Sequence, residues 1–434
     1  MIPIRDIVAS GTPAGWKTVP FWSLFRREKL TGFPDEELLS VYRDYGVIPK
    51  SSRDDNHNKP SEDLSGYQLV TEGALVTNKM KAWQGSIAIS RYRGIVSPAY
   101  YVYTPQSDEC DQFLHYLLRS EPYIGLYGRI SKGVRVNQWD LEHEALRNIP
   151  VLLPDLETQR QIADFLDRET ARIDLLIEKR EKFAALVAEA RDSLIAKMIC
   201  GEGSEELDTP RHDWTDSRPN HWKSERAKVH FRERIDKSVD GTEELLTVSH
   251  ITGVTTRAEK EVNMFLAESN EGYKIVHPGD IVINTMWGWM GAMGVSSHHG
   301  IISPSYGVYR PTSEAFEPDY LDLTLRSKPF VAEVTRRSKG IHSSRLRIYP
   351  DAFLDMRLPV PPRDEQVAIL AELRDRTERE NVLLSKNEQA SALLKEYRSA
   401  LITAAVTGQI DVQTYGKSGT VDRRLDAIQE ELEA

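Results

Sequence analysis

Polar side chains that can read nucleic-acid bases gather in two parts of this sequence, about 206 positions apart. Arg, Asn and Gln can form paired hydrogen bonds to guanine or adenine edges, whereas Lys suits the phosphates common to every sequence. The candidates in the first part are Lys79, Lys81, Gln84, Arg91, Arg93, Lys132, Arg135, Asn137 and Gln138. The candidates in the second part are Trp287, Arg336, Arg337, Lys339, His342, Ser344 and Arg345. As a set they predict binding to double-stranded DNA, although any single one could equally be a solvated loop residue.

No segment carries the residue spacing of a catalytic or cofactor site. The glycines within 288–294 do not follow the G-x-G-x-x-G spacing of a dinucleotide loop, and no G-x-x-x-x-G-K-[ST] motif occurs. Cys110 and Cys200 stand alone, and His298 with His299 lacks a third ligand at useful spacing. We therefore expect no metal, no bound cofactor and no catalysis in this chain.

The sequence contains two copies of one unit. Residues 66–105 align without gaps to residues 272–311, and 18 of the 40 positions are identical. A Ser-Lys-Gly triplet recurs further on, at 131–133 and 338–340. A duplication of this length predicts two domains of the same fold.

The duplication also separates scaffold from candidate reading positions. Positions that are identical in both copies, such as Trp83 and Trp289, cannot distinguish two different base sequences, so we interpret them as scaffold. Polar positions that differ, such as Lys81 against Trp287, are the candidates for base contacts. Lys132 and Lys339 match each other and suit phosphates.

Each copy ends in a stretch whose apolar residues recur at alternating steps of three and four, as in coiled coils. In the first stretch these residues are Ile162, Leu166, Ile173, Leu176, Phe183, Val187 and Leu194. In the second stretch they are Ile369, Leu373, Leu383, Leu394, Tyr397 and Leu401. Helices of about 40 residues would be roughly 60 Å long, and an antiparallel pair needs no long return path. Two amphipathic helices on separate cores are the alternative.

These patterns predict an α/β (α+β) chain of two strand-rich recognition domains separated by two long helices. The helices are expected to form an antiparallel coiled coil, with the two copies related as a pseudo-two-fold repeat. The expected segments are a first domain at 1–154, a helix at 155–200, a linker at 201–221, a second domain at 222–362, a helix at 363–412 and a tail at 413–434.

A formal net charge of -10 is unfavourable for DNA binding, but the charge is distributed unevenly along the chain. Much of the acidity belongs to the two helical stretches. Residues 326–347 hold seven basic residues against Glu333 alone, which gives a local charge of +6. Such a patch would attract a polyanion at short range.

Four sequence segments carry a resemblance to a known family. They are Ile-Val-Ser-Pro-Ala-Tyr at 95–100, Ile-Ser-Pro-Ser-Tyr within 301–306, Leu-Pro-Val-Pro-Pro with Glu365-Gln366, and Thr-Gly-Gln-Ile at 407–410. Over nearly its whole length the chain resembles the specificity subunits of type I restriction-modification systems. The resemblance implies two target-recognition domains that read a bipartite DNA sequence, and helices that dock two methyltransferase subunits.

The resemblance also implies where the chemistry belongs. In that family the methyltransferase subunits methylate adenine with S-adenosylmethionine, and restriction/translocase subunits of the full complex use ATP with Mg. The alternative function is a structural adaptor that holds two protein partners without reading DNA. A fused modification or restriction enzyme is a third class, whose motifs are missing here. Without a leader or a long apolar segment, we expect a cytoplasmic protein with no membrane partner.

Overall fold

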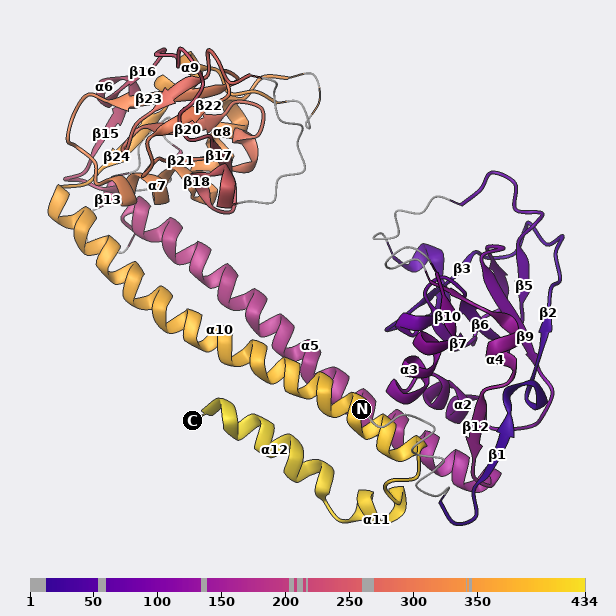
Figure 1. The fold of residues 1–434 in the computed structure, drawn as a ribbon. Helices are drawn as coiled ribbons and strands as arrows, with labels where there is room; N and C mark the ends of the chain where they lie inside the picture. The colour runs from indigo at the N-terminus through magenta and orange to yellow at the C-terminus, as the bar shows by residue number, and fades with distance from the viewer. Residues whose placement is uncertain are drawn as a thin grey trace. The chain divides into compact units, whose positions relative to one another are not determined.

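The structure is a computed structural model that describes residues 13–53, 60–133, 139–202, 207–208, 214–215, 218–259, 269–340, 342 and 346–433. Internal contacts divide the chain into two compact units. The first comprises Met1–Glu181 with Lys386–Ala434, and the second comprises Lys182–Ser385. Each unit contains one domain of strands and short helices, together with part of each of two long helices (Figure 1).

An antiparallel four-stranded sheet forms the centre of the first domain. Its strands run in the order β2 (Phe25–Glu28), β9 (Tyr100–Pro105), β6 (Leu75–Asn78) and β7 (Ile87–Ile89). Val76 lies opposite Val102 on one side and opposite Ala88 on the other. Successive residues of β6 are buried, so aliphatic and β-branched side chains are packed on both faces of the sheet.

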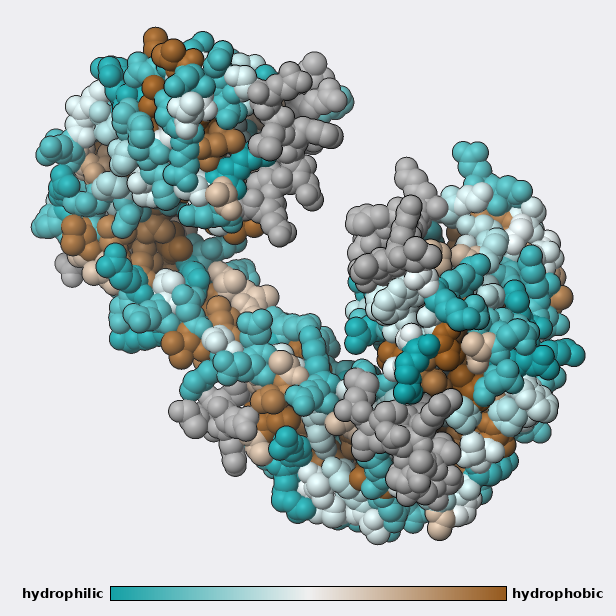
Figure 2. All heavy atoms as spheres, viewed as in Figure 1, coloured by the Kyte–Doolittle hydropathy of each residue, from teal (hydrophilic) through white to brown (hydrophobic). Residues whose placement is uncertain are grey.

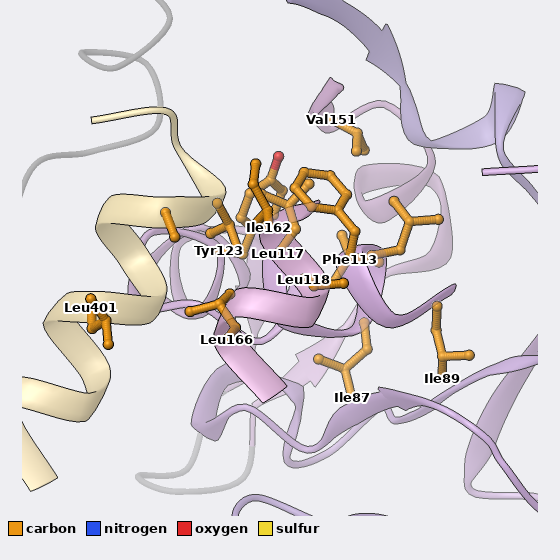
Figure 3. Close-up of a cluster of buried hydrophobic side chains, with 14 of the residues drawn as sticks. Ile87, Ile89, Phe113, Leu117, Leu118, Tyr123, Val151, Ile162, Leu166 and Leu401 are labelled. Carbon is orange, nitrogen blue, oxygen red and sulfur yellow. The ribbon is translucent and has the colours of Figure 1, made fainter. Parts of the chain in front are cut away.

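Helices α2 (Asp111–Leu118) and α3 (Glu121–Ile130) pack against this sheet. Phe113, Leu117 and Tyr123 are fully buried in the same cluster as Ile87 and Ile89 of β7. Residues of both long helices belong to this cluster as well (Figure 3). The first domain and its part of the helical pair therefore share one continuous core.

Shorter elements complete the first domain. They are β1 (Lys17–Pro20), η1 (Phe21–Ser23), β3 (Leu39–Tyr42), β4 (Gly46–Pro49), η2 (Lys50–Ser52), β5 (Gln68–Val70), η3 (Ala82–Gln84), β8 (Gly94–Val96), β10 (Ser131–Lys132), β11 (Asp140–Leu141), α4 (His143–Arg147) and β12 (Pro150–Leu153). Strand β1 pairs antiparallel with β12, so the start of the domain is tied to the strand that leads into the first long helix.

The second domain repeats this architecture. Its sheet has the order β16 (Phe231–Glu233), β23 (Tyr306–Pro311), β20 (Ile281–Asn284) and β21 (Met293–Val295). Val282 lies opposite Val308 and Gly294, which are the positions of Val76, Val102 and Ala88 shifted by 206. The strand register is therefore the same in both copies.

The remaining elements of the second unit lie around that sheet or lead into it. They are β13 (Leu207–Asp208), β14 (Arg218–Pro219), β15 (Lys223–Arg226), α6 (Ala227–His230), β17 (Leu246–Ser249), β18 (Gly253–Thr256), η4 (Arg257–Glu259), β19 (Lys274–Val276), η5 (Gly288–Met290), β22 (Gly300–Ile302), α7 (Pro318–Arg326), α8 (Lys328–Arg337), α9 (Pro350–Leu354) and β24 (Arg357–Val360).

Two long helices pair antiparallel within each unit. They are α5 (Leu156–Cys200), of 45 residues, and α10 (Arg363–Val406), of 44 residues. In the first unit Asp174 of α5 accepts hydrogen bonds from Arg398 of α10, the shorter at 2.8 Å. In the second unit Arg191 donates to Glu380 at 2.7 Å. Residue numbers fall along α10 as they rise along α5, which confirms the predicted antiparallel pair and the mixed α/β class.

Most of the apolar residues predicted for the helical contact are shielded from solvent. The buried ones are Ile162, Leu166, Ile173, Leu373, Leu394 and Leu401. The partly buried ones are Leu176, Val187, Leu194, Ile369 and Tyr397. Phe183 and Leu383 require a correction, because they are 39% and 46% exposed. The adjacent Ala184 and Leu384 are partly buried instead. The spacing of three and four residues is compatible with either member of an adjacent apolar pair, and in the folded helices the second member is the more buried.

Two further helices follow α10 in the first unit. Helices α11 (Val412–Lys417) and α12 (Thr420–Glu433) add Val412, Val421 and Leu425 to the core cluster of that unit. Within the described residues, no helix is long and apolar enough to cross a membrane.

Candidate nucleic-acid interface

The hairpin turn between β6 and β7 carries three of the predicted DNA-binding residues. Its backbone is fixed by side chains that both copies share. The amide oxygen of Asn78 accepts a hydrogen bond from the Met80 backbone at 3.1 Å, and the Trp83 indole donates to the Met80 carbonyl at 3.1 Å. Gly85 follows η3 with a positive φ of 93°, a backbone conformation that residues other than glycine rarely adopt.

The corresponding turn of the second domain is built in the same way. Asn284 accepts from the Met286 backbone at 3.1 Å, the Trp289 indole donates to the Met286 carbonyl at 2.9 Å, and Gly291 has a φ of 86°. The shared residues thus build one turn twice. The residues that differ occupy the remaining positions of each turn.

The differing residues give the two turns opposite chemistry. In the first domain Lys81 and Gln84 are exposed, and the Lys79 ammonium lies 5.9 Å from the centre of the Tyr101 ring. In the second domain Trp287 is 52% exposed and Met290 is 37% exposed. One turn therefore offers hydrogen-bond donors and charge, whereas the other offers an aromatic and apolar surface.

A second loop, residues 133–139, begins and ends beside the turn in the first domain. Strands β10 and β11 flank this loop, and the Leu141 backbone donates to the Lys79 carbonyl at 2.9 Å. The Trp83 and Trp139 rings are 4.9 Å apart, which holds the end of the loop against the turn. Lys132 enters the loop and pairs with Glu142 at 3.1 Å. Arg135, Asn137 and Gln138 lie outside the described residues.

The second domain has the same pair of loops. Lys339 and Arg347 form an antiparallel bridge, and the Ile348 backbone donates to the Thr285 carbonyl at 3.1 Å. His342, between them, is exposed. Ser344 and Arg345 lie outside the described residues. In both domains, therefore, the segment after the Ser-Lys-Gly triplet begins and ends next to the hairpin turn.

Arg91 and Arg93 stand apart from this group. They follow β7, so they lie at the end of that strand opposite to the hairpin turn. Arg91 donates to Gln112 at 2.6 Å, and Arg93 donates to Glu36 at 2.8 Å. Both are exposed, but the structure does not bring them together with Lys81 and Gln84.

A cleft in the second domain collects several cations predicted from the sequence. Its lining residues are Lys228, Arg336, Arg337, Ser338, Lys339, Asp351, Ala352, Leu354 and Asp355. Arg336 and Arg337 both donate to the buried carboxylate of Glu333, at 2.6 and 2.5 Å. Burial alone would raise the pKa of Glu333, but these hydrogen bonds lower it. Glu333 is therefore ionised and neutralises part of the cleft.

The local charge of +6 predicted for residues 326–347 is too high for the folded protein. Lys328 pairs with Asp192 at 2.9 Å, and Arg326 pairs with Asp322 at 3.1 Å. Asp355 lies 3.8 Å from Arg337. These carboxylates lie outside residues 326–347, so a count over that stretch alone does not include them. Lys339 and the 68% exposed side chain of Arg336 remain on the surface.

The sequence of the first domain is similar to that of a known protein family. Residues 14–183 match the family model of the type I restriction modification DNA specificity domain. The first domain belongs to that family. The resemblance stated from the sequence is thereby confirmed.

A solved structure with a TM-score above 0.5 shares the fold, and two further structures are similar over most of their length. A chain from work on complex assembly and conformational transition of the type I R-M system is 17% identical, with a TM-score of 0.58, over 92% of this chain and 99% of that chain. The HsdS subunit from Thermoanaerobacter tengcongensis is 18% identical, with a TM-score of 0.44, over 92% and 98% of the chains. The type I restriction-modification S subunit from M. genitalium is 12% identical, with a TM-score of 0.33, over 90% and 96%.

The second domain is a second copy of the first domain. It shares 18 of 40 aligned residues with the first copy over the central stretch, and its sheet has the same strand order and register. The two hairpin turns are thus equivalent parts of two copies of one fold.

The first specificity domain contains a cation that sequence reasoning missed. The Arg27 guanidinium lies 4.4 Å from the centre of the Tyr101 ring, the same ring that Lys79 approaches. Tyr101 aligns with Gly307 in the second copy, so the two copies differ at the ring that Arg27 contacts. This difference is the sequence signal that could have pointed to Arg27 as a candidate. In the part of the chain that the structure describes, no group of three or more His, Cys, Asp or Glu side chains could hold a metal ion.

Proposed function

We propose that this chain is the non-catalytic DNA-recognition subunit of a type I restriction-modification complex, and that each specificity domain reads one half of a bipartite target. One observation carries the proposal. The same hairpin turn occurs twice on the same scaffold, with Lys81 and Gln84 at one tip and Trp287 and Met290 at the other. Two turns with the same backbone but different exposed side chains are suited to reading two different half-sites.

Base reading is assigned to the turn and to the loop beside it. Gln84, Arg135, Asn137 and Gln138 have side chains that can pair with adenine or guanine edges. In the second domain Trp287, His342, Ser344 and Arg345 take this role. Base contacts are also assigned to Lys79 and Lys81, and phosphate contacts to the cations Lys132, Arg336, Arg337 and Lys339. Arg91 and Arg93 would contact the phosphate backbone away from the turn.

The partners follow from the same proposal. Two methyltransferase subunits would dock on α5 and α10, whose outward faces combine charge with exposed apolar residues such as Leu175 and Val382. Restriction/translocase subunits would join the full complex. S-adenosylmethionine, and ATP with Mg for restriction, would be bound by those partners, because this chain supplies recognition alone.

Replacing one specificity domain tests the proposal. The chain is reconstituted with its methyltransferase partners, and residues 13–154 are exchanged for the first domain of another specificity subunit. Sequencing of the methylated DNA should show one half of the target changed and the other half retained. The unmodified chain and a chain with residues 222–362 exchanged serve as matched controls. Methylation that changes in both halves contradicts the two-reader model, and a complex without sequence preference indicates an adaptor.

A further inference from the structure

The hairpin turn between β20 and β21 of the second domain presents large apolar side chains to solvent. Met286, Trp287 and Met290 are 38%, 52% and 37% exposed, and we call these three residues the apolar tip. Single exposed apolar residues are common on protein surfaces, but three large ones on one short turn indicate a binding surface. Apolar, brown residues interrupt the hydrophilic surface of the second domain (Figure 2).

The backbone beneath the apolar tip is fixed by contacts with the rest of the domain. Gly288 is buried, and a Cβ at this position would lie 3.0 Å from Ile348 and 3.3 Å from Ile283. The Thr335 hydroxyl of α8 donates to the Trp289 carbonyl at 3.0 Å. The space below the turn is therefore filled, and the side chains of the apolar tip stay on the surface.

The fold does not require the apolar tip. Trp287 and Met290 align with Lys81 and Gln84 of the first copy, whereas the third position is methionine in both copies. The same turn, with the same two side-chain hydrogen bonds, forms around the polar pair in the first domain. The exposed aromatic and apolar side chains are thus a feature of the second domain that its scaffold does not explain.

The loop beside the turn differs between the copies in the same direction. Tyr349 takes the place of Glu142 at a shift of 207 positions, and it is 47% exposed. It follows Ile348, whose backbone donates to the Thr285 carbonyl in the turn at 3.1 Å. In the first domain Glu142 pairs with Lys132, and this carboxylate has no counterpart at position 349. The surface next to the apolar tip is therefore less polar than its duplicate.

Cations beside the apolar tip indicate that its occupant is a nucleic acid. Arg336 directly follows Thr335, which anchors the turn, and its side chain is 68% exposed although it pairs with Glu333. Lys339, three positions further on, is exposed as well. Such cations suit phosphates, which lie on either side of the base edges in a DNA groove. An apolar partner protein would leave these charges without a complement.

The chemistry of the apolar tip selects among the bases. In the major groove of DNA the 5-methyl group of thymine is the apolar group that a base pair presents, and the other groups donate or accept hydrogen bonds. An apolar tip pressed against those donors and acceptors would take them out of water without replacing their hydrogen bonds, which is unfavourable. Contact with a methyl group carries no such cost.

We propose that the apolar tip of the second domain recognises thymine by its 5-methyl group in the major groove of the second half-site. This inference rests on the proposed function, because it specifies how one of the two domains reads its half of the target. The first domain, with Lys81 and Gln84 in the matching places, reads its half-site by hydrogen bonds instead.

Removal of single methyl groups from the DNA tests the proposal. The full chain is assembled with its methyltransferase partners, and exchange of residues 222–362 identifies the half-site of the second domain. Each thymine of that half-site, on either strand, is replaced in turn by deoxyuridine, which lacks the methyl group and keeps every hydrogen bond. Fluorescence anisotropy should show about fourfold weaker binding for each contacted methyl group. The same replacements in the first half-site should cause no comparable loss.

A variant of the chain assigns the effect to the apolar tip. Trp287→Lys with Met290→Gln introduces the residues of the first copy, which forms the same turn with them. For this variant the duplexes with thymine and with deoxyuridine should bind equally. Val239→Ser is the control, because it removes an exposed apolar side chain between β16 and β17, and it should retain the difference. Circular dichroism should show that both variants are folded, since the substituted side chains are exposed.

The other outcomes separate this inference from the proposed function. Equal binding of both duplexes by the unmodified chain, with sequence preference retained, would overturn the inference alone, and so would a second half-site without thymine. If the double variant binds both duplexes more weakly by the same factor as each other and the unmodified chain does not distinguish them, the tip inserts into DNA without reading the methyl group, which also overturns it. A complex of the unmodified chain that binds every duplex equally would contradict the proposed function as well.

Discussion

Gln159 and Gln366, 207 positions apart, fasten the starts of α5 and α10 to their domains through the same hydrogen bonds. Both are fully buried. Gln159 accepts from the Cys110 backbone at 2.9 Å, and Gln366 accepts from the Glu317 backbone at 2.8 Å. Each also donates at 3.0 Å to the carbonyl of the proline five positions earlier. The glutamine of the family-like segment at 358–366 is thus a structural clamp.

Replacing either clamp should destabilise its own unit. Gln159→Leu removes the partners of a buried backbone N–H and a buried carbonyl, which costs about 1–3 kcal/mol of the free energy of unfolding. Gln366→Leu should have an effect of similar size in the second unit. Urea unfolding of the full chain measures both. Gln409→Ala, at an exposed position, is the control and should change the free energy of unfolding by less than about 0.5 kcal/mol.

Acid should weaken the first unit through His115. Burial, followed by the neighbouring Arg119 guanidinium, lowers the pKa of His115 to about 3. Below the ordinary pKa of about 6.5, His115 is protonated in the unfolded chain but stays neutral in the folded chain. The free energy of unfolding therefore falls as the pH drops. At pH 5 the loss from this residue is up to about 2 kcal/mol.

His115→Gln isolates that contribution, because glutamine can still accept from Arg119 and does not titrate. The free energy of unfolding is measured at pH 7 and at pH 5 for both proteins. Its decrease should be smaller for the variant by up to about 2 kcal/mol. Equal decreases would show that His115 is protonated in the folded chain.

Substitutions at the two hairpin turns should act on separate half-sites. Lys81→Ala with Gln84→Ala should reduce discrimination in one half of the DNA target by about 1–3 kcal/mol for each lost base contact, and leave the other half unchanged. Trp287→Ala should do the reverse. Binding to DNA with single-base changes in each half measures this. Lys29→Ala, at an exposed position outside the turns, is the control.

Gly408 ends α10 where no side chain fits. Its φ is +70°, and a Cβ would lie 2.6 Å from Pro13 and 3.1 Å from the Trp16 ring. Gly408→Ala should lower the free energy of unfolding by at least about 1 kcal/mol, from the backbone conformation alone. Gly128→Ala is the comparison, because a Cβ there meets no atom within 4 Å. An equally stable Gly408→Ala chain would mean that α10 ends without contacting Pro13.

The sequence predicted the duplicated architecture because two independent signals agree. Identity at a fixed shift defines the copies, and steps of three and four define α5 and α10. The scaffold of the turns could also be inferred, since Trp83 and Trp289 are shared and each holds its turn by the same hydrogen bond.

Other features depend on contacts between distant segments. Phe183 and Ala184 satisfy the helical period almost equally, and only packing shows that Ala184 is the more buried. The charge at 326–347 was overestimated because Asp192, on α5, meets Lys328 only after folding. Neither result follows from local sequence.

The first unit is discontinuous in the chain, whereas the second is continuous. The core of the first unit includes Ala390, Leu394 and Leu401, which are the last segment of α10. A ribosome therefore delivers every residue of Lys182–Ser385 before it delivers the residues that close the earlier domain's core. During synthesis the apolar surface of the first domain that α10 later covers therefore stays exposed. A chain released before residue 386 would expose that surface to chaperones and proteases.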